Sequence, residues 1–238
     1  MGVAFDDMSM EEALDAAEDL LHSGKKGYCV TPNAEILYYA LHAPEYQTVL
    51  NRASLVIPDG AGTVLGSKIL GSPLKDKVPG IDFANNLCDR MAREGQTLFL
   101  LGSKEGVAEI AAEKLREMHP GLIVCGTHHG YFKDPAPVIE KINQSQADVV
   151  FVCLGAPKQE QFMAEHMDEL CARFMIGLGG SLDVYSGNIQ RAPEWVRRCN
   201  LESLYRLFQD PRRLSRWMTR PKFVIACLKE RRHRRKNG

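Results

Sequence analysis

One aspartate stands where a carboxylate could act as a general base. Leu55-Val56-Ile57 is a short apolar run of the kind that forms a strand buried on both faces, and Pro58-Asp59-Gly60 ends it abruptly. Ligands bind at the carboxyl ends of strands in open α/β sheets, so Asp59 could take a proton from a bound hydroxyl group. The tripeptide also fits an ordinary turn in which Asp59 caps the following helix, and the spacing alone favours that simpler interpretation.

A cationic loop follows this turn. After a helix of small residues expected over 61–70, the chain carries Lys75, Asp76 and Lys77. An acid followed by lysines suits a reaction that needs a base and releases an anion. The sequence has no D-x-D pair of carboxylates to hold a divalent metal and no cluster of zinc ligands. We therefore expect no metal and no cofactor, with Lys and Arg neutralising any departing diphosphate.

Polar or glycine-rich turns end the other predicted strands. In a parallel sheet such turns lie at one edge and can converge on a single crevice. Backbone N–H groups at these turns can contact phosphate, although tight turns at helix starts explain the same glycines. The candidate nucleotide-binding residues are Gly102, Ser103, Gly155, Lys158, Gly179 and Gly180. No G-x-G-x-x-G follows the first strand and no Walker lysine motif is present, which counts against dinucleotide and P-loop chemistry.

Predicted strands and helices alternate along the chain. Apolar runs predict strands at 27–30, 55–57, 97–101, 122–125, 148–154 and 173–176. A capping box at Ser9 to Glu12 starts a helix that runs to about Leu21. Further helices are expected from 34, over 61–70, up to 118 and after 155. This alternation predicts an α/β fold, a Rossmann-like, mainly parallel sheet with helices on both faces.

Charge divides the chain into two parts. The formal net charge is zero, yet residues 191–236 carry 15 Lys and Arg against 4 Asp and Glu, a surplus of 15 − 4 = 11. We expect a catalytic domain over 1–190 and a helical, basic appendage over 191–238, with turns at Asp210-Pro211 and Arg220-Pro221.

The seven cysteines show no paired spacing, no secretory leader is recognisable, and no apolar run approaches the ~18 residues that span a bilayer. These features suit the cytoplasm.

Six motifs occur in an order and spacing that resemble one family. They are TPNAE at 31–35, PDGAG at 58–62, KVPGIDF at 77–83, LFLLG at 98–102, LGAPKQE at 154–160 and RAPEWVRR at 191–198. The chain resembles the WecG/TagA/CpsF glycosyltransferases over essentially its full length, and LGAPKQE and RAPEW are the most specific segments. The resemblance implies an inverting transfer of N-acetylmannosamine, or its uronic acid, from a UDP-sugar. The implied acceptor is undecaprenyl-diphosphate-linked GlcNAc, in the synthesis of wall teichoic acid or a related surface polymer.

The resemblance also implies residue roles. The family's proposed base falls on Asp59, and its substrate-contacting residues fall on Thr31, Asn33 and Gln159. A position usually occupied by Arg is here Lys77, which offers a point charge rather than a bidentate fork. The arginines of the family's C-terminal appendage, which is thought to close over the active site, would be Arg206, Arg213 and Arg216.

The appendage combines apolar and basic residues in a way that suits a membrane surface. Phe223 to Leu228 lies between Lys222 and the basic run from Lys229 to Lys236. We expect it to lie on an anionic membrane, which would place the protein on the inner face of the plasma membrane. Aromatic residues at helical spacing argue against nucleic acid as a partner. A homo-oligomer stays open, as do two other functions: a different UDP-sugar enzyme, such as an epimerase or dehydrogenase, and a noncatalytic sugar-nucleotide binder at the membrane.

Overall fold

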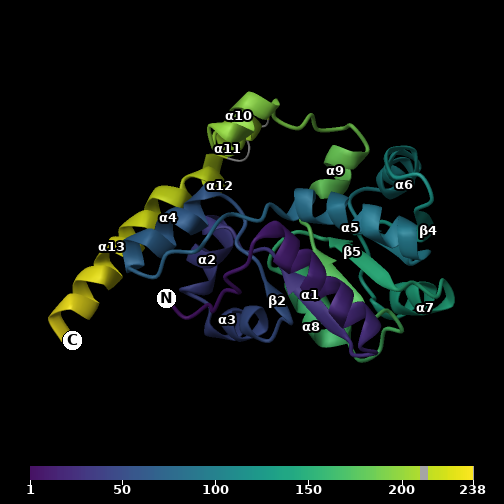
Figure 1. Ribbon diagram of the computed structural model, residues 1–238, viewed down its shortest axis with the longest axis horizontal. Helices are drawn as coiled ribbons and strands as arrows, with labels where there is room; N and C mark the ends of the chain where they lie inside the picture. Colours follow the sequence, from purple (N-terminus) through teal and green to yellow (C-terminus); the bar gives the residue numbers. More distant parts are fainter. Residues whose placement is uncertain (210–213, 238) are drawn as a thin grey trace.

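A single parallel sheet forms the centre of the molecule. The computed structural model describes residues 1–209 and 214–237. In these residues six strands pair in the order β2-β1-β6-β5-β3-β4, every pair parallel, which confirms the predicted sheet (Figure 1). The strands are β1 Gly27–Val30, β2 Leu55–Val56, β3 Thr97–Gly102, β4 Ile123–His128, β5 Val149–Cys153 and β6 Phe174–Gly177. Strands β1, β5 and β6 are buried throughout, as expected for a sheet covered on both sides.

Helices cover both faces of the sheet and continue beyond it at the C-terminal end. They are α1 Met10–His22, α2 Ala34–Ala40, α3 Pro44–Asn51, α4 Ala61–Leu70, α5 Gly80–Glu94, α6 Val107–Met118, α7 Ala136–Gln144, α8 Lys158–His166, α9 Ser181–Tyr185, α10 Glu194–Arg198, α11 Glu202–Gln209, α12 Leu214–Trp217 and α13 Thr219–Asn237. Buried side chains of α1, α5, α6 and α9 pack on one face, and those of α2, α3, α7 and α8 pack on the other.

This arrangement opens crevices at the carboxyl edge of the sheet. A gap opens where the helices that follow two neighbouring strands leave for opposite faces. Strand β1 is followed by α2 on one face, whereas its neighbour β6 is followed by α9 on the other. Strand β5 is followed by α8, whereas its neighbour β3 is followed by α6 on the opposite face. Two of these crevices lie beside candidate residues, the first between β1 and β6 and the second between β3 and β5.

The C-terminal helices pack back on the sheet domain. Helix α13 lies along α4 and α2, where Phe223 and Cys227 form a small apolar cluster with Ala34 and Leu37 (Figure 1). Gly66 makes this close approach possible, because a Cβ atom there would lie 2.7 Å from the Phe223 ring. Part of the apolar run expected to face a membrane is thus buried within the protein.

One predicted turn in the appendage is wrong. The sequence places a turn at Arg220-Pro221, but Pro221 lies in the first turn of α13, where a helix does not need the N–H that proline lacks. The other predicted turn, Asp210-Pro211, lies outside the described residues.

Candidate active site

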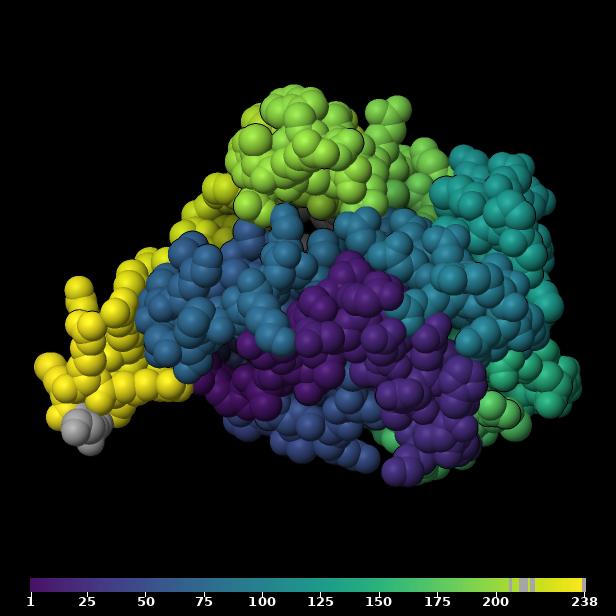
Figure 2. All heavy atoms as spheres, viewed as in Figure 1, coloured from purple at the N-terminus to yellow at the C-terminus, as the bar shows by residue number. Residues whose placement is uncertain are grey.

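A cleft of about 180 Å³ lies at the crevice between β1 and β6. Its walls come from the turns after β1, β2 and β6, from the start of α4 and α5, and from the C-terminal segment. In Figure 2 the light-green C-terminal helices arch over the blue segment of α4 and α5, with a hollow between them. Four of the candidate residues line this cleft: Thr31, Asn33, Asp59 and Lys77.

Asp59 lies three residues after the end of β2, and hydrogen bonds hold the backbone in this turn at two points. The N–H of Ile57 donates to the Val30 carbonyl at 3.0 Å, so the strand pairing continues to the residue before Pro58. The Thr63 hydroxyl donates to the Asp59 carbonyl at 3.0 Å. Helix α4 is capped by Gly60, at φ +79°, and no side chain makes a capping hydrogen bond there. Gly60 rather than Asp59 therefore occupies the N-cap position of α4, and Asp59 is the residue before it.

Thr31 and Asn33 extend the floor of the cleft from the end of β1. The Thr31 hydroxyl donates to the Gly177 carbonyl at 3.0 Å, which joins the turns after β1 and β6. The Asn33 Oδ1 atom accepts from the N–H groups of Glu35 and Ile36, at 2.9 and 3.2 Å, and so caps α2. Both residues hold the local backbone as well as lining the cleft.

Lys77 joins the cleft to the C-terminal segment. Its Nζ atom donates to Asn200 Oδ1 at 2.5 Å and approaches the Arg197 carbonyl at 3.5 Å. Arg197 and Arg220 also line the cleft, so three cationic residues contribute to its lining. Asp59 faces the same space, which places a carboxylate and several cations in one cleft.

Sequence reasoning missed the C-terminal residues that line this cleft. Arg197 lies within the RAPEWVRR motif, so the motif was a usable signal, whereas nothing local marks Asn200 or Arg220. The arginines selected from the sequence cannot be compared directly. Arg206 lies in α11 and Arg216 in α12, but their side chains are outside the described part of the structure, as is the whole of Arg213.

The candidate nucleotide-binding residues do not line this cleft. Most of them belong to the second crevice, between β3 and β5. There the Ser103 hydroxyl donates to Asp183 at 2.9 Å, and a Cβ at Gly102 would lie 2.3 Å from the Cys153 carbonyl oxygen. Lys158 donates to the Gly130 carbonyl at 3.1 Å and lies 4.6 Å from the centre of the Phe132 ring. Gly155 and Gly179 have positive φ angles, and Gly179-Gly180 follows β6 between the two crevices.

Gln159 lies behind the cleft rather than in its wall. Its side chain is 2% exposed on the first turn of α8. The Oε1 atom accepts from the Gly179 N–H at 2.8 Å, and the Nε2 atom donates to Glu160 at 2.7 Å. Its contact with the cleft therefore runs through the turn after β6.

Within the part of the chain that the structure describes, no three His, Cys, Asp or Glu side chains gather where they could hold a metal ion. None of the described helices combines the length and apolar character that crossing a bilayer requires.

The sequence is similar to those of known proteins over nearly the whole chain. The sequence profile of the glycosyl transferase WecG/TagA/CpsF family matches residues 1–237. A protein of Bacillus spizizenii named N-acetylglucosaminyldiphosphoundecaprenol N-acetyl-beta-D-mannosaminyltransferase is 38% identical over 89% of this chain and 82% of its own length. Proteins of the same name from Bacillus subtilis and Staphylococcus aureus are 35% and 33% identical, over 86% and 98% of this chain and 80% and 92% of their own lengths. The chain therefore belongs to the WecG/TagA/CpsF family of glycosyl transferases.

Proposed function

We propose that this chain transfers an N-acetyl-β-D-mannosaminyl group from a UDP-sugar to N-acetylglucosaminyldiphosphoundecaprenol. The acceptor and the transferred group are those in the names of its relatives in Bacillus and Staphylococcus. The product would feed wall teichoic acid or a related surface polymer. The observation that carries the proposal is the shared cleft, in which Asp59 lies among Lys77, Arg197 and Arg220.

The transfer needs a base and a stabilised leaving group. Asp59 takes the proton from the acceptor hydroxyl, and that oxygen attacks the anomeric carbon from the side opposite UDP. The bond between the anomeric carbon and the diphosphate oxygen breaks, so the configuration inverts and UDP leaves with the electron pair. A positioned carboxylate contributes ~10²–10⁴-fold to such a step. Lys77 and the cleft arginines stabilise the charge that develops on the diphosphate.

The two crevices suit the two halves of the donor. Thr31 and Asn33 line the cleft beside Asp59 and can hydrogen-bond the transferred sugar. The neighbouring crevice offers glycine turns and Lys158 to the nucleotide. In this proposal its contacts come from Gly102, Ser103, Gly155, Lys158, Gly179 and Gly180, with Gln159 shaping the turn between the crevices. Arg206, Arg213 and Arg216 stay candidates for the acceptor diphosphate.

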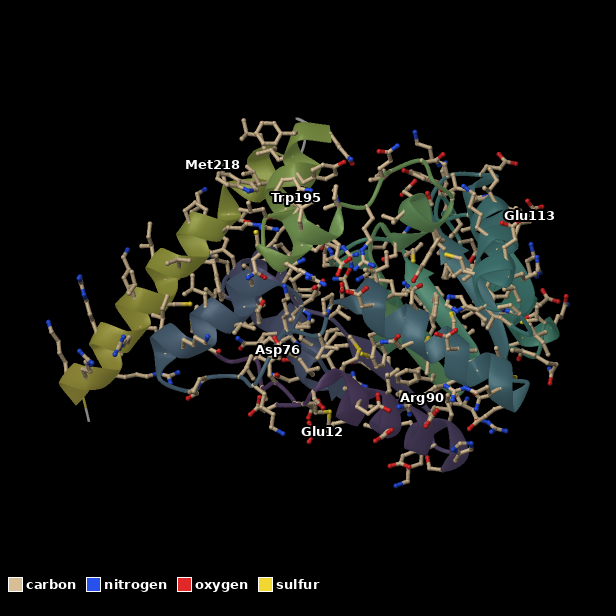
Figure 3. The ribbon with its side chains drawn as sticks, turned by 45° about the horizontal axis from the view of Figure 1, so that its top comes forward. Glu12, Asp76, Arg90, Glu113, Trp195 and Met218 are labelled. Atoms are coloured by element: carbon tan, nitrogen blue, oxygen red, sulfur yellow. The ribbon has the colours of Figure 1, made fainter. Side chains whose placement is uncertain are left out.

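A membrane surface is the natural place for a lipid-linked acceptor. Exposed apolar side chains concentrate in the C-terminal segment, where Trp195 is 67% and Phe208 78% exposed. Figure 3 shows Trp195 and Met218 on the yellow-green C-terminal helices in the upper part of the view. Together with the basic surplus of residues 191–236, they favour docking on anionic lipid from the cytoplasmic side. The segment after residue 190 then acts as a unit that recruits the acceptor and closes the cleft.

Release of UDP tests the reaction directly. The protein is incubated with a panel of UDP-N-acetylhexosamines, including the mannosamine and mannosaminuronic acid forms, and a soluble lipid-diphosphate-linked GlcNAc. We expect UDP and a disaccharide product only with UDP-N-acetylmannosamine, and activity that persists in excess EDTA. Preference for the uronic acid donor would change the substrate, whereas tight NAD binding with no UDP release would favour an epimerase or dehydrogenase. Loss of activity in EDTA, restored by Mg²⁺ or Mn²⁺, would refute charge stabilisation by Lys and Arg alone.

A further inference from the structure

A carboxyl group is buried behind the cleft, and the reaction as derived above does not use it. Glu160 lies on the first turn of α8 and is 0% exposed. Burial raises the pKa of Glu160, while the hydrogen bond from Gln159 acts in the opposite direction. Because burying a polar group costs free energy unless it is well paired, a carboxyl group here is expected to serve the groups it contacts.

The carboxyl group determines which way the Gln159 amide faces. A glutamine amide has an acceptor end and a donor end of nearly the same shape. Glu160 Oε1 accepts from Gln159 Nε2 at 2.7 Å, which directs Gln159 Oε1 to the Gly179 N–H at 2.8 Å. If the amide turned over, its NH₂ group would face the N–H of Gly179, donor against donor.

The loop that Gln159 holds is a wall of the cleft. The loop runs from Gly177 to Ser181, and its Leu178 and Ser181 line the cleft. The Gly177 carbonyl accepts the Thr31 hydroxyl at 3.0 Å, so the loop also fixes Thr31. Space at this point is tight, because a Cβ at Gly177 would lie 2.9 Å from Gln159 Nε2.

We propose that Glu160 is a positioning residue for sugar transfer. It orients the Gln159 amide, which holds the 177–181 loop and, through Gly177, sets Thr31 at the edge of the cleft. The proposal rests on the proposed function and extends it to a residue that touches no substrate. What the site needs from Glu160 is a hydrogen-bond acceptor of this size, not a negative charge.

Two substitutions distinguish a need for a hydrogen-bond acceptor at position 160 from a need for a negative charge there. Glu160→Gln keeps an oxygen acceptor without charge, and we expect its kcat/KM to stay within about threefold of the wild-type value. Glu160→Met keeps a similar volume without an acceptor, and we expect kcat/KM to fall by ~10–10²-fold, since displacements of about 1 Å in positioning groups have such effects. In a double-mutant cycle, Gln159→Met should add little to the loss in Glu160→Met, because both break the same chain of contacts.

The loop itself supplies a readout that does not depend on activity. Amide hydrogen exchange at Gly179, followed by NMR in protein labelled with ¹⁵N-glycine, should quicken in Glu160→Met and stay slow in Glu160→Gln. Ile142→Ala is the control for stability. Ile142 is fully buried in the apolar cluster that also contains Phe162 and Met163 of α8, but it belongs to α7. Exchange and kcat/KM are compared at temperatures equally far below each variant's thermal midpoint.

The outcomes are distinct. Full activity and slow Gly179 exchange in Glu160→Met would overturn the positioning role, as would an activity loss in Glu160→Gln as large as that in Glu160→Met. If the wild-type protein transferred no sugar to any acceptor, the proposed function would fail. The exchange experiment would still decide whether Glu160 holds the loop.

Discussion

At the scale of residues, the cleft joins a carboxylate to cations that come from distant parts of the chain. Asp59 directly precedes Gly60, the N-cap residue of α4, and its backbone carbonyl accepts a hydrogen bond from Thr63. Lys77 is held by Asn200 and approaches the Arg197 carbonyl. The predictions at this scale separate chemistry at the cleft from stability behind it.

Replacing the proposed base should remove chemistry and spare the fold. Asp59→Asn keeps the shape of the side chain but cannot accept a proton, so kcat should fall by ~10²–10⁴-fold. The thermal midpoint should stay near that of the wild-type protein, because asparagine has almost the same size and the N-cap residue of α4, Gly60, is unchanged. UDP release measures the effect. Asp134→Asn is the control, since Asp134 accepts from the Ala136 N–H at the start of α7 and does not line the cleft. Near wild-type turnover in Asp59→Asn would end the assignment of the base.

The buried Glu160 should give stability a specific dependence on pH. Because its pKa is raised above the usual 4.5, the folded protein binds this proton more tightly than the unfolded chain does. The stabilisation is complete below pH 4.5 and is lost as pH rises toward the folded pKa. Glu160→Gln cannot titrate, so the free energy of unfolding of the wild-type protein should fall relative to it, by at most about 1.4 kcal/mol per pH unit. Urea unfolding of both proteins across this range measures the difference, and a constant difference would contradict the raised pKa.

At the scale of elements, α4 connects the cleft to the C-terminal helix α13. Its first residues, Ala61 and Gly62, line the cleft, and Gly66 lies against the Phe223 ring of α13. A Cβ at Gly62 would lie 2.9 Å from that of Ala34 in α2. The small residues of this helix are therefore explained by the two helices that pack on it. Because Arg220, the second residue of α13, lines the cleft, the packing of α13 on α4 also positions part of the cleft wall.

A larger side chain at Gly66 should displace α13 and impair transfer. Gly66→Val forces a branched side chain against buried Phe223, and overpacking of this kind typically costs about 1–3 kcal/mol. We expect a lower thermal midpoint, faster proteolysis within α13 and a decrease in kcat/KM of roughly tenfold or more as Arg220 moves. Leu65→Val introduces the same branched residue at a position that is 48% exposed, and it should behave like the wild-type protein. Equal activity of the two variants would show that α13 does not shape the cleft.

At the scale of the whole molecule, charge is distributed unevenly. The surplus of 15 − 4 = 11 positive charges in residues 191–236 balances an equal deficit in the rest of the chain. Helix α13 extends away from the sheet domain and carries the basic residues at its far end, near the C-terminus in Figure 1. Its first turn lies at the cleft. Recruitment to lipid and closure of the cleft can therefore be tested separately.

Reversing charges at the far end of α13 should weaken membrane binding alone. The exposed residues Arg231, Arg232 and Arg235 are changed together to Glu. With each basic residue near an anionic surface contributing about 1 kcal/mol, liposome affinity should fall by on the order of 10²-fold or more. Turnover on a soluble acceptor should be unchanged, because screened attraction acts at a distance whereas phosphate stabilisation needs contact.

The control for this prediction changes net charge equally elsewhere. Lys25, Lys133 and Lys141 are exposed, lie outside the C-terminal segment and are changed to Glu. Binding is measured by sedimentation with vesicles that contain or lack anionic lipid. If both triple variants lost affinity equally, net charge rather than α13 would govern binding. If the α13 variant bound normally, membrane docking through this helix would be wrong.

Local patterns in the sequence determined the strands, the parallel α/β class and the position of Asp59. Buried strands such as Val149–Cys153 are apolar at every position, and the polar or glycine-rich residues that end them are visible in the sequence. The capping box at Ser9 is equally local, and the structure confirms it. Such features depend on contacts over a few residues, which sequence patterns record directly.

Only the tertiary structure decided which distant residues share the cleft. Lys77 and Asn200 are 123 positions apart, and nothing in either segment specifies their contact. Gln159 shows the same limit. Its motif predicts a functional residue, but it does not show that the side chain is buried behind the loop after β6. The spacing of apolar residues predicts which side chains are buried. Strand order and the packing of α13 on α4 determine which residues those side chains contact. Asp59 could therefore be proposed as the base from the sequence, whereas the full set of cations that share its cleft could be identified only from the fold.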